Sequence, residues 1–249
     1  MLPLLRSKVL GIAVDLHDNY ADWLAQRLLT SSGTQVITLN SEMVIQARRN
    51  LDLAQLIEQV ELAVPDGAGV VLFLRSLNLK VNRCPGIELA EAMVRVAFMS
   101  EKKIFLIGGA PGVLEQVRES WQNSLPQFQA KSIVGMHHGY FDAQTEDDLG
   151  RQLQALQPDL VLVGLGVPRQ EFWIAQKRSL CPNAVWIGVG GSFDVWSGTK
   201  TRAPKLLREN NLEWLYRLYQ EPWRWRRMLS IPQFAWYAIV QSLRDRCKS

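Results

Sequence analysis

The 249-residue sequence predicts an α/β fold: a Rossmann-like, mostly parallel sheet flanked by helices, followed by a helical, basic C-terminal appendage. Short apolar runs alternate with longer segments of helical pattern, which is the rhythm of a doubly wound sheet. Several runs, such as Ile104–Ile107 and Leu160–Val163, are continuously apolar, as in strands that helices cover on both faces. The rhythm stops near Ser197–Thr199. We therefore expect a core of residues 1–197 and an appendage of residues 198–249.

Each expected element follows from its own pattern. The strand-length apolar runs are Val9–Val14, Gln35–Thr38, Val70–Phe73, Ile104–Ile107, Ser132–Val134, Leu160–Val163 and Val185–Val189. Helical spacing of apolar residues fills the intervals Asn19–Thr30, Ser41–Asn50, Leu53–Ala63, Gly86–Ser100, Val113–Ser124, Thr145–Leu156 and Arg169–Leu180. Beyond the core the pattern is helical, and Pro204, Pro222 and Pro232 interrupt it.

The composition is that of a folded protein, with 47% hydrophobic and 21% charged residues. Cys84, Cys181 and Cys247 form no CxxC pair, which argues against a disulfide scaffold and a zinc site. No apolar stretch reaches the roughly 18–20 residues that span a bilayer, and no signal peptide is recognisable. We expect a protein of the cytoplasm.

The charge is unevenly distributed along the chain. Residues 198–249 carry 11 Lys and Arg against four Asp and Glu, whereas residues 1–197 carry 17 against 20. The basic segment also holds Trp214, Trp223, Trp225 and Trp236. Cations beside indoles indicate a phosphate-rich partner, either an anionic membrane surface or a nucleic acid. The basic residues that we expect to face an acceptor or a membrane are Arg202, Lys205, Arg208, Arg217, Arg224 and Arg227.

Ligands of open α/β sheets bind beyond the carboxyl ends of the strands, so the residues after each strand are the informative ones. Gly108 and Gly109 follow one run, and Gly191, Ser192 and Asp194 follow another. Backbone N–H groups in such glycine turns bind phosphate, and a carboxylate accepts from a hydroxyl. The same residues also make ordinary tight turns.

Three polar residues, Arg169, Gln170 and Glu171, open the helix after Leu160–Val163. The amide of Gln170 suits a base or a sugar, and a guanidinium suits a phosphate. Glu171 either orients Arg169 or favours the helix N-terminus. A capped helix start with solvated charges explains the pattern equally well.

Other polar residues have two interpretations each. Asp66, in Pro-Asp-Gly, is either a turn residue or a general base whose pKa burial raises. Thr38 and Asn40 follow a strand and should face the same edge, although Asn40 also suits a helix N-cap. His137 and His138 lack metal-ligand spacing, so we expect His138 to contact a ligand or to pack, without a metal.

Together these residues resemble the WecG/TagA/CpsF glycosyltransferases over about residues 38–227. The matching segments, in order, are Thr38-Leu39-Asn40, Pro65-Asp66-Gly67, Pro85-Gly86, Phe105-Leu106-Ile107-Gly108-Gly109, His138-Gly139-Tyr140-Phe141, Gly164-Leu165-Gly166, Pro168-Arg169-Gln170-Glu171, Gly190-Gly191-Ser192-Phe193-Asp194, Arg202-Ala203-Pro204 and Leu212-Glu213-Trp214-Leu215-Tyr216-Arg217. One departure is Glu88, where family members commonly carry aspartate.

The resemblance implies an inverting, metal-independent transferase on the cytoplasmic face of the membrane. Such enzymes move a sugar, often N-acetylmannosamine, from a UDP-sugar to a polyprenyl-diphosphate-linked sugar for cell-wall or surface polysaccharides. It implies Asp66 as the base, aided by Thr38, with Gln170 and Asp194 in the donor pocket. It also implies no cofactor and an appendage that engages the membrane. The oligomeric state stays open, a homo-oligomer included.

Two other classes were weighed. A nucleotide-binding dehydrogenase or epimerase would require a GxGxxG turn and a ribose-binding acid, and the sequence has neither. A nucleic-acid-binding protein would account for the basic, aromatic tail, yet the core is acidic and carries no reader motif. We expect no nucleic-acid partner.

Overall fold

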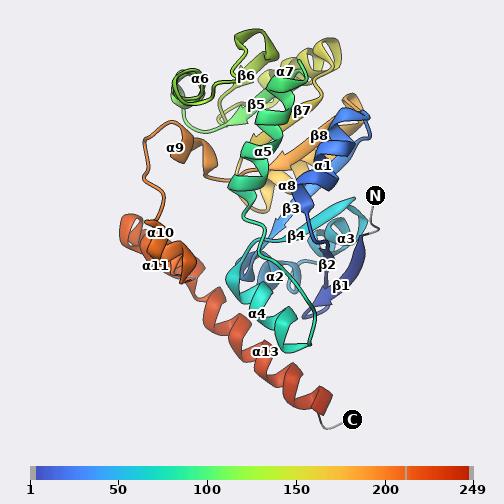
Figure 1. Cartoon of the computed structure of the whole chain (residues 1–249), viewed down its shortest axis with the longest axis vertical. Coiled ribbons are helices and arrows are strands. Elements are labelled where there is room, and N and C mark those ends of the chain that lie inside the picture. The colour runs from blue at the N-terminus through green and yellow to red at the C-terminus, as the bar shows by residue number, and fades with distance from the viewer. Residues whose placement is uncertain (1–3, 211, 247–249) are drawn as a thin grey trace.

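The computed structural model describes residues 4–210 and 212–246, and it confirms the α/β prediction. Residues 1–3, 211 and 247–249 belong to the expected core and appendage but lie outside the described residues, and so does Cys247. A central sheet carries helices on both faces, and a long helix extends beyond it to the C-terminus (Figure 1).

The central sheet has six strands, and every neighbouring pair is parallel. Its strands are β3 (Thr34–Leu39), β4 (Leu62–Pro65), β5 (Ile104–Gly108), β6 (Ile133–His137), β7 (Leu160–Gly164) and β8 (Val185–Gly188), in the spatial order β4-β3-β8-β7-β5-β6. Because all strands run the same way, their carboxyl ends meet at one edge of the sheet. Every turn that leaves a strand at this edge faces the same side of the molecule.

Helices cover both faces of this sheet (Figure 1). One face packs against α1 (Tyr20–Leu29), α5 (Gly86–Met99), α6 (Val113–Ser124) and α9 (Ser192–Trp196). The other packs against α2 (Ser41–Ala47), α3 (Leu51–Gln59), α7 (Ala143–Leu156) and α8 (Arg169–Lys177). The short helix η2 (Arg178–Leu180) contacts α7 and α8, and η1 (Ala130–Ser132) directly precedes β6. Alternation along each strand divides the core: Leu106 belongs to the first face, and Phe105 to the second.

The expected strand Val9–Val14 is instead part of a hairpin of β1 (Leu5–Val9) and β2 (Ile12–Leu16). Leu10 and Gly11 form the two-residue turn with φ of 51° and 88°. Two positive φ angles in succession match the twist of paired strands, which explains why this apolar run reverses direction.

An ion pair with a buried carboxylate attaches this hairpin to the edge strand β4. Arg6 donates to both carboxylate oxygens of Asp15, at 2.8 and 3.0 Å, and Asp15 is 1% exposed. Asp15 Oδ2 also accepts from the Ala63 backbone N–H at 2.7 Å. The Asp15 carboxylate thereby pairs with a backbone N–H of β4, a kind of donor that usually lacks a partner on an edge strand.

The expected strand Val70–Phe73 is wrong, because these residues lie in α4 (Ala68–Ser76). The strand at this point is β4, which the sequence analysis placed at the end of a helix. Continuous apolar runs of this length do not distinguish a buried strand from a buried helix. The correction matters for function, because Asp66 follows a strand and therefore stands at the carboxyl edge.

The appendage consists of α10 (Lys205–Glu209), α11 (Glu213–Gln220), η3 (Pro222–Arg224), α12 (Trp225–Met228) and α13 (Ser230–Arg246). The last helix passes along α2 and α4 (Figure 1). Its Phe234 is 4% exposed and meets Phe73 edge-on, with 6.3 Å between ring centroids. The C-terminal helix is therefore packed on the core through an apolar contact.

We expect Phe234→Ala to lower the free energy of unfolding by roughly 3–5 kcal/mol, because a buried aromatic ring leaves a cavity. Trp236→Ala is the matched control, since Trp236 lies on the same helix and is 66% exposed. Urea denaturation measures both. Equal effects of the two substitutions would show that Phe234 does not anchor α13.

Candidate active site

The predicted site residues share one edge of the sheet but not one point on it. Asp66 follows β4, Asn40 follows β3, Gly190 follows β8, and His138 follows β6. With neighbouring strands about 4.8 Å apart, the five steps from β4 to β6 span roughly 24 Å. The residues therefore fall into an Asp66 group at β4 and β3 and a second group beyond β8, β7, β5 and β6.

Asp66 lies directly after β4, where the backbone is held by β3. The N–H groups of Asp66 and Gly67 donate to the Leu39 carbonyl at 3.0 and 3.1 Å. The Asp66 side chain is 25% exposed, yet protein surrounds it closely. Burial raises the pKa of the Asp66 carboxyl, while Arg83 and Arg217 oppose the rise. A carboxylate with a raised pKa is a stronger base.

The other two predicted catalytic residues lie beside Asp66 in different roles. Thr38 packs against Gly86, where an added Cβ would stand 2.6 Å from Thr38 Cγ2 and 3.2 Å from its hydroxyl oxygen. The Gly86 backbone N–H is itself a hydrogen-bond partner that lowers the pKa of Asp66. Asn40 caps α2, because its side-chain oxygen accepts from the Met43 N–H at 3.0 Å. Thr38 and Asp66 thus approach the same helix start from two strands.

An ion-pair cluster that the sequence pattern does not predict surrounds Asp66. Arg83 donates from Nε to the Asp66 backbone carbonyl at 2.6 Å, and its Nη2 lies 3.0 Å from Glu213 Oε2 and 3.8 Å from Asp66 Oδ1. Glu213 Oε1 also accepts from Arg217 at 2.6 Å. Burial raises the pKa of Glu213, but Arg217 and Arg83 outweigh it and hold that pKa low.

Glycines in the second group serve close packing. Gly108 and Gly109 have φ of 132° and 70°, and an added Cβ at Gly108 would stand 2.4 Å from the Gly164 carbonyl oxygen. The Gly109 carbonyl accepts from the Gly139 N–H at 2.9 Å, which joins the turns after β5 and β6. These glycines bring three strand ends together regardless of any ligand.

Gln170 and Glu171 are buried, each 2% exposed, and they bind one another. Gln170 Nε2 donates to Glu171 Oε1 at 2.8 Å, and Gln170 Oε1 accepts from the Gly190 N–H at 3.1 Å. The other carboxylate oxygen of Glu171 has no partner, and burial raises the pKa of Glu171 to about 7. In this structure the pair supports the turn after β8.

Asp194 is engaged in an ion pair rather than left open. Lys200 Nζ lies 2.6 Å from Asp194 Oδ2 and 2.9 Å from Glu221 Oε1 at the end of α11. Burial by itself would lower the pKa of Lys200, but the two carboxylates outweigh burial and raise that pKa. The Ser192 hydroxyl donates within its own turn to the Val189 carbonyl at 2.7 Å, and Gly191 precedes α9.

Arg169 contacts the loop that follows His138. The Arg169 guanidinium lies 5.3 Å from the ring centroid of Phe141, on the loop that follows His138. His138 Nδ1 accepts from the Tyr140 N–H at 3.3 Å. Within residues 4–210 and 212–246, no three His, Cys, Asp or Glu side chains are grouped as metal ligands.

Several predicted basic residues of the appendage point at core carboxylates. Glu88, on the first turn of α5, lies 2.5 Å from Arg202 and 3.6 Å from Arg208, and the Nε of each arginine is buried without a partner. Arg227 pairs with Glu42 at 2.7 Å. Lys205 begins α10 and Arg224 ends η3. Arg202 precedes α10, whereas Lys205 and Arg208 lie within it.

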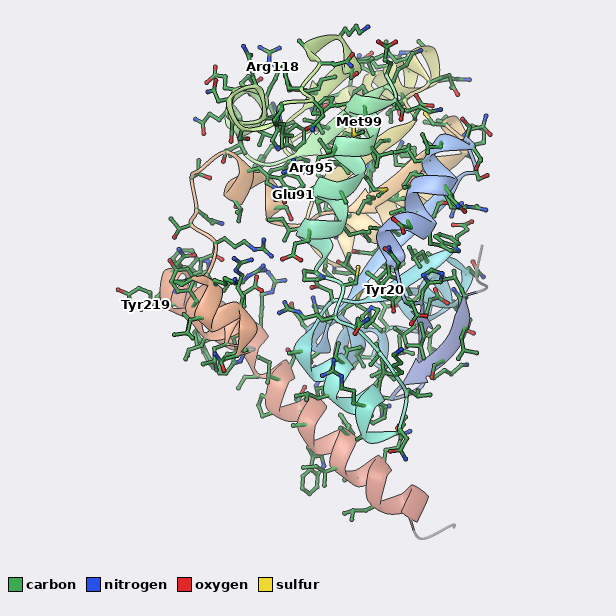
Figure 2. All side chains as sticks on the ribbon, viewed as in Figure 1. Tyr20, Glu91, Arg95, Met99, Arg118 and Tyr219 are labelled. Carbon is green, nitrogen blue, oxygen red and sulfur yellow. The ribbon has the colours of Figure 1, made fainter. Side chains whose placement is uncertain are left out.

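The outward surface of the appendage is apolar and aromatic. Leu215 is 48% exposed, Tyr219 82%, Trp223 71% and Trp225 53%. Figure 2 shows Tyr219 pointing away from the core on the outer side of α11. A cavity of about 490 Å³ lies here, lined by Leu207, Leu215, Tyr216, Leu218 and Tyr219. Another of about 510 Å³ lies beside His137 and α7, so neither of these two is lined by Asp66.

No helix in the described part of the chain combines the length and apolarity needed to cross a membrane.

Comparison with known proteins gives consistent matches. The model of the Glycosyl transferase WecG/TagA/CpsF family matches residues 7–248. The N-acetylglucosaminyldiphosphoundecaprenol N-acetyl-beta-D-mannosaminyltransferase of Bacillus subtilis (strain 168) is 36% identical over 219 residues, which cover 87% of this chain and 84% of that protein. The protein of the same name from Staphylococcus aureus (strain MW2) is 35% identical over 210 residues, 84% of this chain and 80% of its own.

We expect the stability difference between Glu171→Gln and the native chain to depend on pH. Folding raises the pKa of the Glu171 carboxyl from its ordinary 4.5 to about 7. The folded native chain therefore loses stability as the pH increases through this range, because the buried carboxyl must ionise. The variant should gain roughly 3 kcal/mol relative to the native chain between pH 4 and pH 8.

Denaturant unfolding at pH 4, 6 and 8 measures this difference. Glu119→Gln, on an exposed part of α6, controls for the loss of a carboxyl as such. A constant difference between Glu171→Gln and the native chain at all three pH values would contradict the burial of an uncompensated carboxyl.

Proposed function

Because the chain belongs to the WecG/TagA/CpsF glycosyl transferase family, we propose that it moves N-acetylmannosamine or a related hexose from a UDP-sugar to a polyprenyl-diphosphate-linked sugar. The relatives from B. subtilis and S. aureus carry names that state this sugar and such an acceptor. The product would enter cell-wall or surface polysaccharide. Family membership favours this reaction over a dehydrogenase, an epimerase or a nucleic-acid-binding protein.

The observation that carries the proposal is the Asp66 carboxyl at the carboxyl edge of the sheet. Its pKa is raised by burial, and it is accompanied by two guanidinium groups, those of Arg83 and Arg217. An inverting transfer requires a base for the acceptor hydroxyl and positive charge for a diphosphate leaving group. In this proposal the cluster would supply the base and part of the positive charge.

In the proposed step, Asp66 takes the proton of the acceptor hydroxyl while that oxygen attacks the anomeric carbon of the donor. A new carbon–oxygen bond forms on one face, and the bond from the anomeric carbon to the diphosphate oxygen breaks on the other. The configuration inverts, and UDP leaves with the bonding electron pair. Thr38, which packs beside Gly86, would assist the hydroxyl in this proposal. Asn40 fixes the start of α2 next to it.

Cationic side chains, rather than a metal, would stabilise the leaving diphosphate in this proposal. Arg202 and Arg208 converge on Glu88, and each has a buried Nε without a partner. Guanidinium groups bind phosphate oxygens through forked hydrogen bonds. We place the nucleotide over the turns after β5, β6 and β8, with Gly108, Gly109, His138, Arg169, Gly191, Ser192 and Asp194 as lining residues. Gln170 and Glu171 support those turns from within the core.

The appendage, residues 198–249, would dock the protein on the inner face of the cell membrane. Exposed indole and phenol rings prefer the membrane interface, and each basic residue near an anionic bilayer contributes about 1 kcal/mol. Trp223, Trp225 and Tyr219 supply the rings. Docking there would bring the lipid-linked acceptor close to α11. Glu213 of this helix binds Arg83, and Arg83 lies beside Asp66.

We expect Asp66→Asn to reduce sugar transfer at least about 100-fold, because an amide cannot accept the hydroxyl proton. UDP binding should persist, since the nucleotide turns are unchanged. Turnover is measured with UDP-N-acetylmannosamine and a lipid-diphosphate N-acetylglucosamine acceptor, and UDP affinity by calorimetry. Asp52→Asn, at an exposed position on α3, is the control. Native turnover by Asp66→Asn would remove Asp66 from the role of base.

We expect the double substitution Trp223→Ala with Trp225→Ala to weaken binding to anionic vesicles by roughly tenfold or more, because two indoles no longer bury apolar surface. Co-sedimentation with phosphatidylglycerol vesicles measures the change. Leu51→Ala is the control, since Leu51 is 75% exposed on α3 of the core. Undiminished sedimentation of the double variant would place the membrane contact elsewhere.

A further inference from the structure

Arg83 lies between two carboxylates and favours one of them. Its Nη2 is 3.0 Å from Glu213 Oε2, a hydrogen-bond distance, but 3.8 Å from Asp66 Oδ1. Its Nε donates to the Asp66 backbone carbonyl at 2.6 Å, which tethers the guanidinium beside Asp66. A movement of about 1 Å would bring Nη2 into direct hydrogen bonding with the Asp66 carboxylate.

Glu213 is held firmly in the position from which it binds Arg83. It is 9% exposed and lies in the first turn of α11, where the helix dipole favours a negative charge. Its second oxygen accepts from Arg217, one helical turn further along, at 2.6 Å. The carboxylate therefore uses both oxygens for cations, and one of these is the cation closest to Asp66.

We propose that Glu213 is a positioning residue for the reaction: it retains Arg83 and thereby preserves the basicity of the Asp66 carboxylate. A guanidinium that closed fully onto Asp66 would stabilise the charged form and weaken the base. The same guanidinium at 3.8 Å still supplies positive charge to the site. This inference rests on the proposed function, because it assigns significance to the proton affinity of Asp66.

The effects of the neighbouring groups on the pKa of Asp66 agree with this role. Arg83 and Arg217 lower the pKa of Asp66, Glu213 raises it, and the Gly86 N–H lowers it. Cys84 precedes Gly86 in the adjoining segment, and burial raises the pKa of its thiol to about 12, so it adds no charge at neutral pH. Glu88, on α5, is engaged by Arg202 and Arg208. Glu213 therefore binds both cations that lower the pKa of Asp66, and Arg83 is the one whose Nη2 lies 3.8 Å from the Asp66 carboxylate.

A titration of the Asp66 carboxyl by ¹³C NMR tests the inference without requiring turnover. The full-length native chain and the Glu213→Gln variant are labelled in aspartate, and Asp66→Asn identifies the signal. We expect Glu213→Gln to lower the pKa of Asp66, because Arg83 then closes onto it. An unchanged or higher pKa would overturn the inference. Glu213→Asp, which keeps the charge, should restore most of the native value.

A matched control separates this effect from loosening of the appendage. Glu221→Gln removes a carboxylate at the other end of α11, where Glu221 meets Lys200 at 2.9 Å, and leaves Arg83 untouched. It should not change the Asp66 titration; an equal shift would overturn the inference. In the Arg83→Gln background, Glu213→Gln should lose most of its effect, because the cation it releases is absent. An undiminished shift in that background would also overturn it.

Turnover gives the second readout. The acid limb of kcat/KM against pH should move to lower pH in Glu213→Gln, with a plateau roughly three- to tenfold lower because the base is weaker. An acid limb that stays in place would contradict the role in catalysis. If the native chain transfers no sugar, the proposed function fails, while the NMR titration still decides whether Glu213 controls Asp66.

Discussion

The balance of charge around one half-buried carboxylate constrains the site more than any other interaction. Removing Asp66 from water without a partner would protonate it at neutral pH, whereas a full ion pair with Arg83 would leave it a weak base. The structure holds Arg83 Nη2 at 3.8 Å from Asp66 and at 3.0 Å from Glu213. The pKa of the Asp66 carboxyl therefore stays raised by burial, although the positive charge of Arg83 lies nearby.

The sheet provides the rigidity that such a balance requires. β4 is an edge strand, and edge strands are the least constrained part of a sheet. Its end is held by two backbone hydrogen bonds to the Leu39 carbonyl, and its outer side by Asp15, which accepts from Ala63. Arg6 in turn bonds to Asp15 and to the Val60 carbonyl. The N-terminal hairpin therefore keeps Asp66 in place although it contributes nothing to the site directly.

The hydrophobic pattern of short segments predicted several strands that are apolar over their whole length. The continuous runs at β5, β7 and β8 are confirmed as strands, which helices cover on both faces. The run Val70–Phe73 failed because a buried helix requires the same residues, and β4 was missed as a result. Glu213 and Arg83 are separated by 130 residues, so no spacing rule connects them. The burial of Gln170 and Glu171 likewise depends on Gly188, where a Cβ would stand 2.6 Å from Gln170 Nε2.

Several basic side chains of the appendage face the core, whereas several of its aromatic rings are exposed. Arg202 and Arg208 meet Glu88, and Arg227 meets Glu42, so these cations already have core carboxylates as partners. Under the proposed function, a diphosphate would have to compete with those carboxylates, and its greater charge and additional acceptor oxygens would favour it. Under the proposed docking, attraction to the bilayer would depend on exposed rings such as Tyr219, Trp223 and Trp225, which are 82%, 71% and 53% exposed. The proposed roles would thus fall to different side chains of the appendage, with arginines paired to core carboxylates for the diphosphate and exposed rings for the membrane.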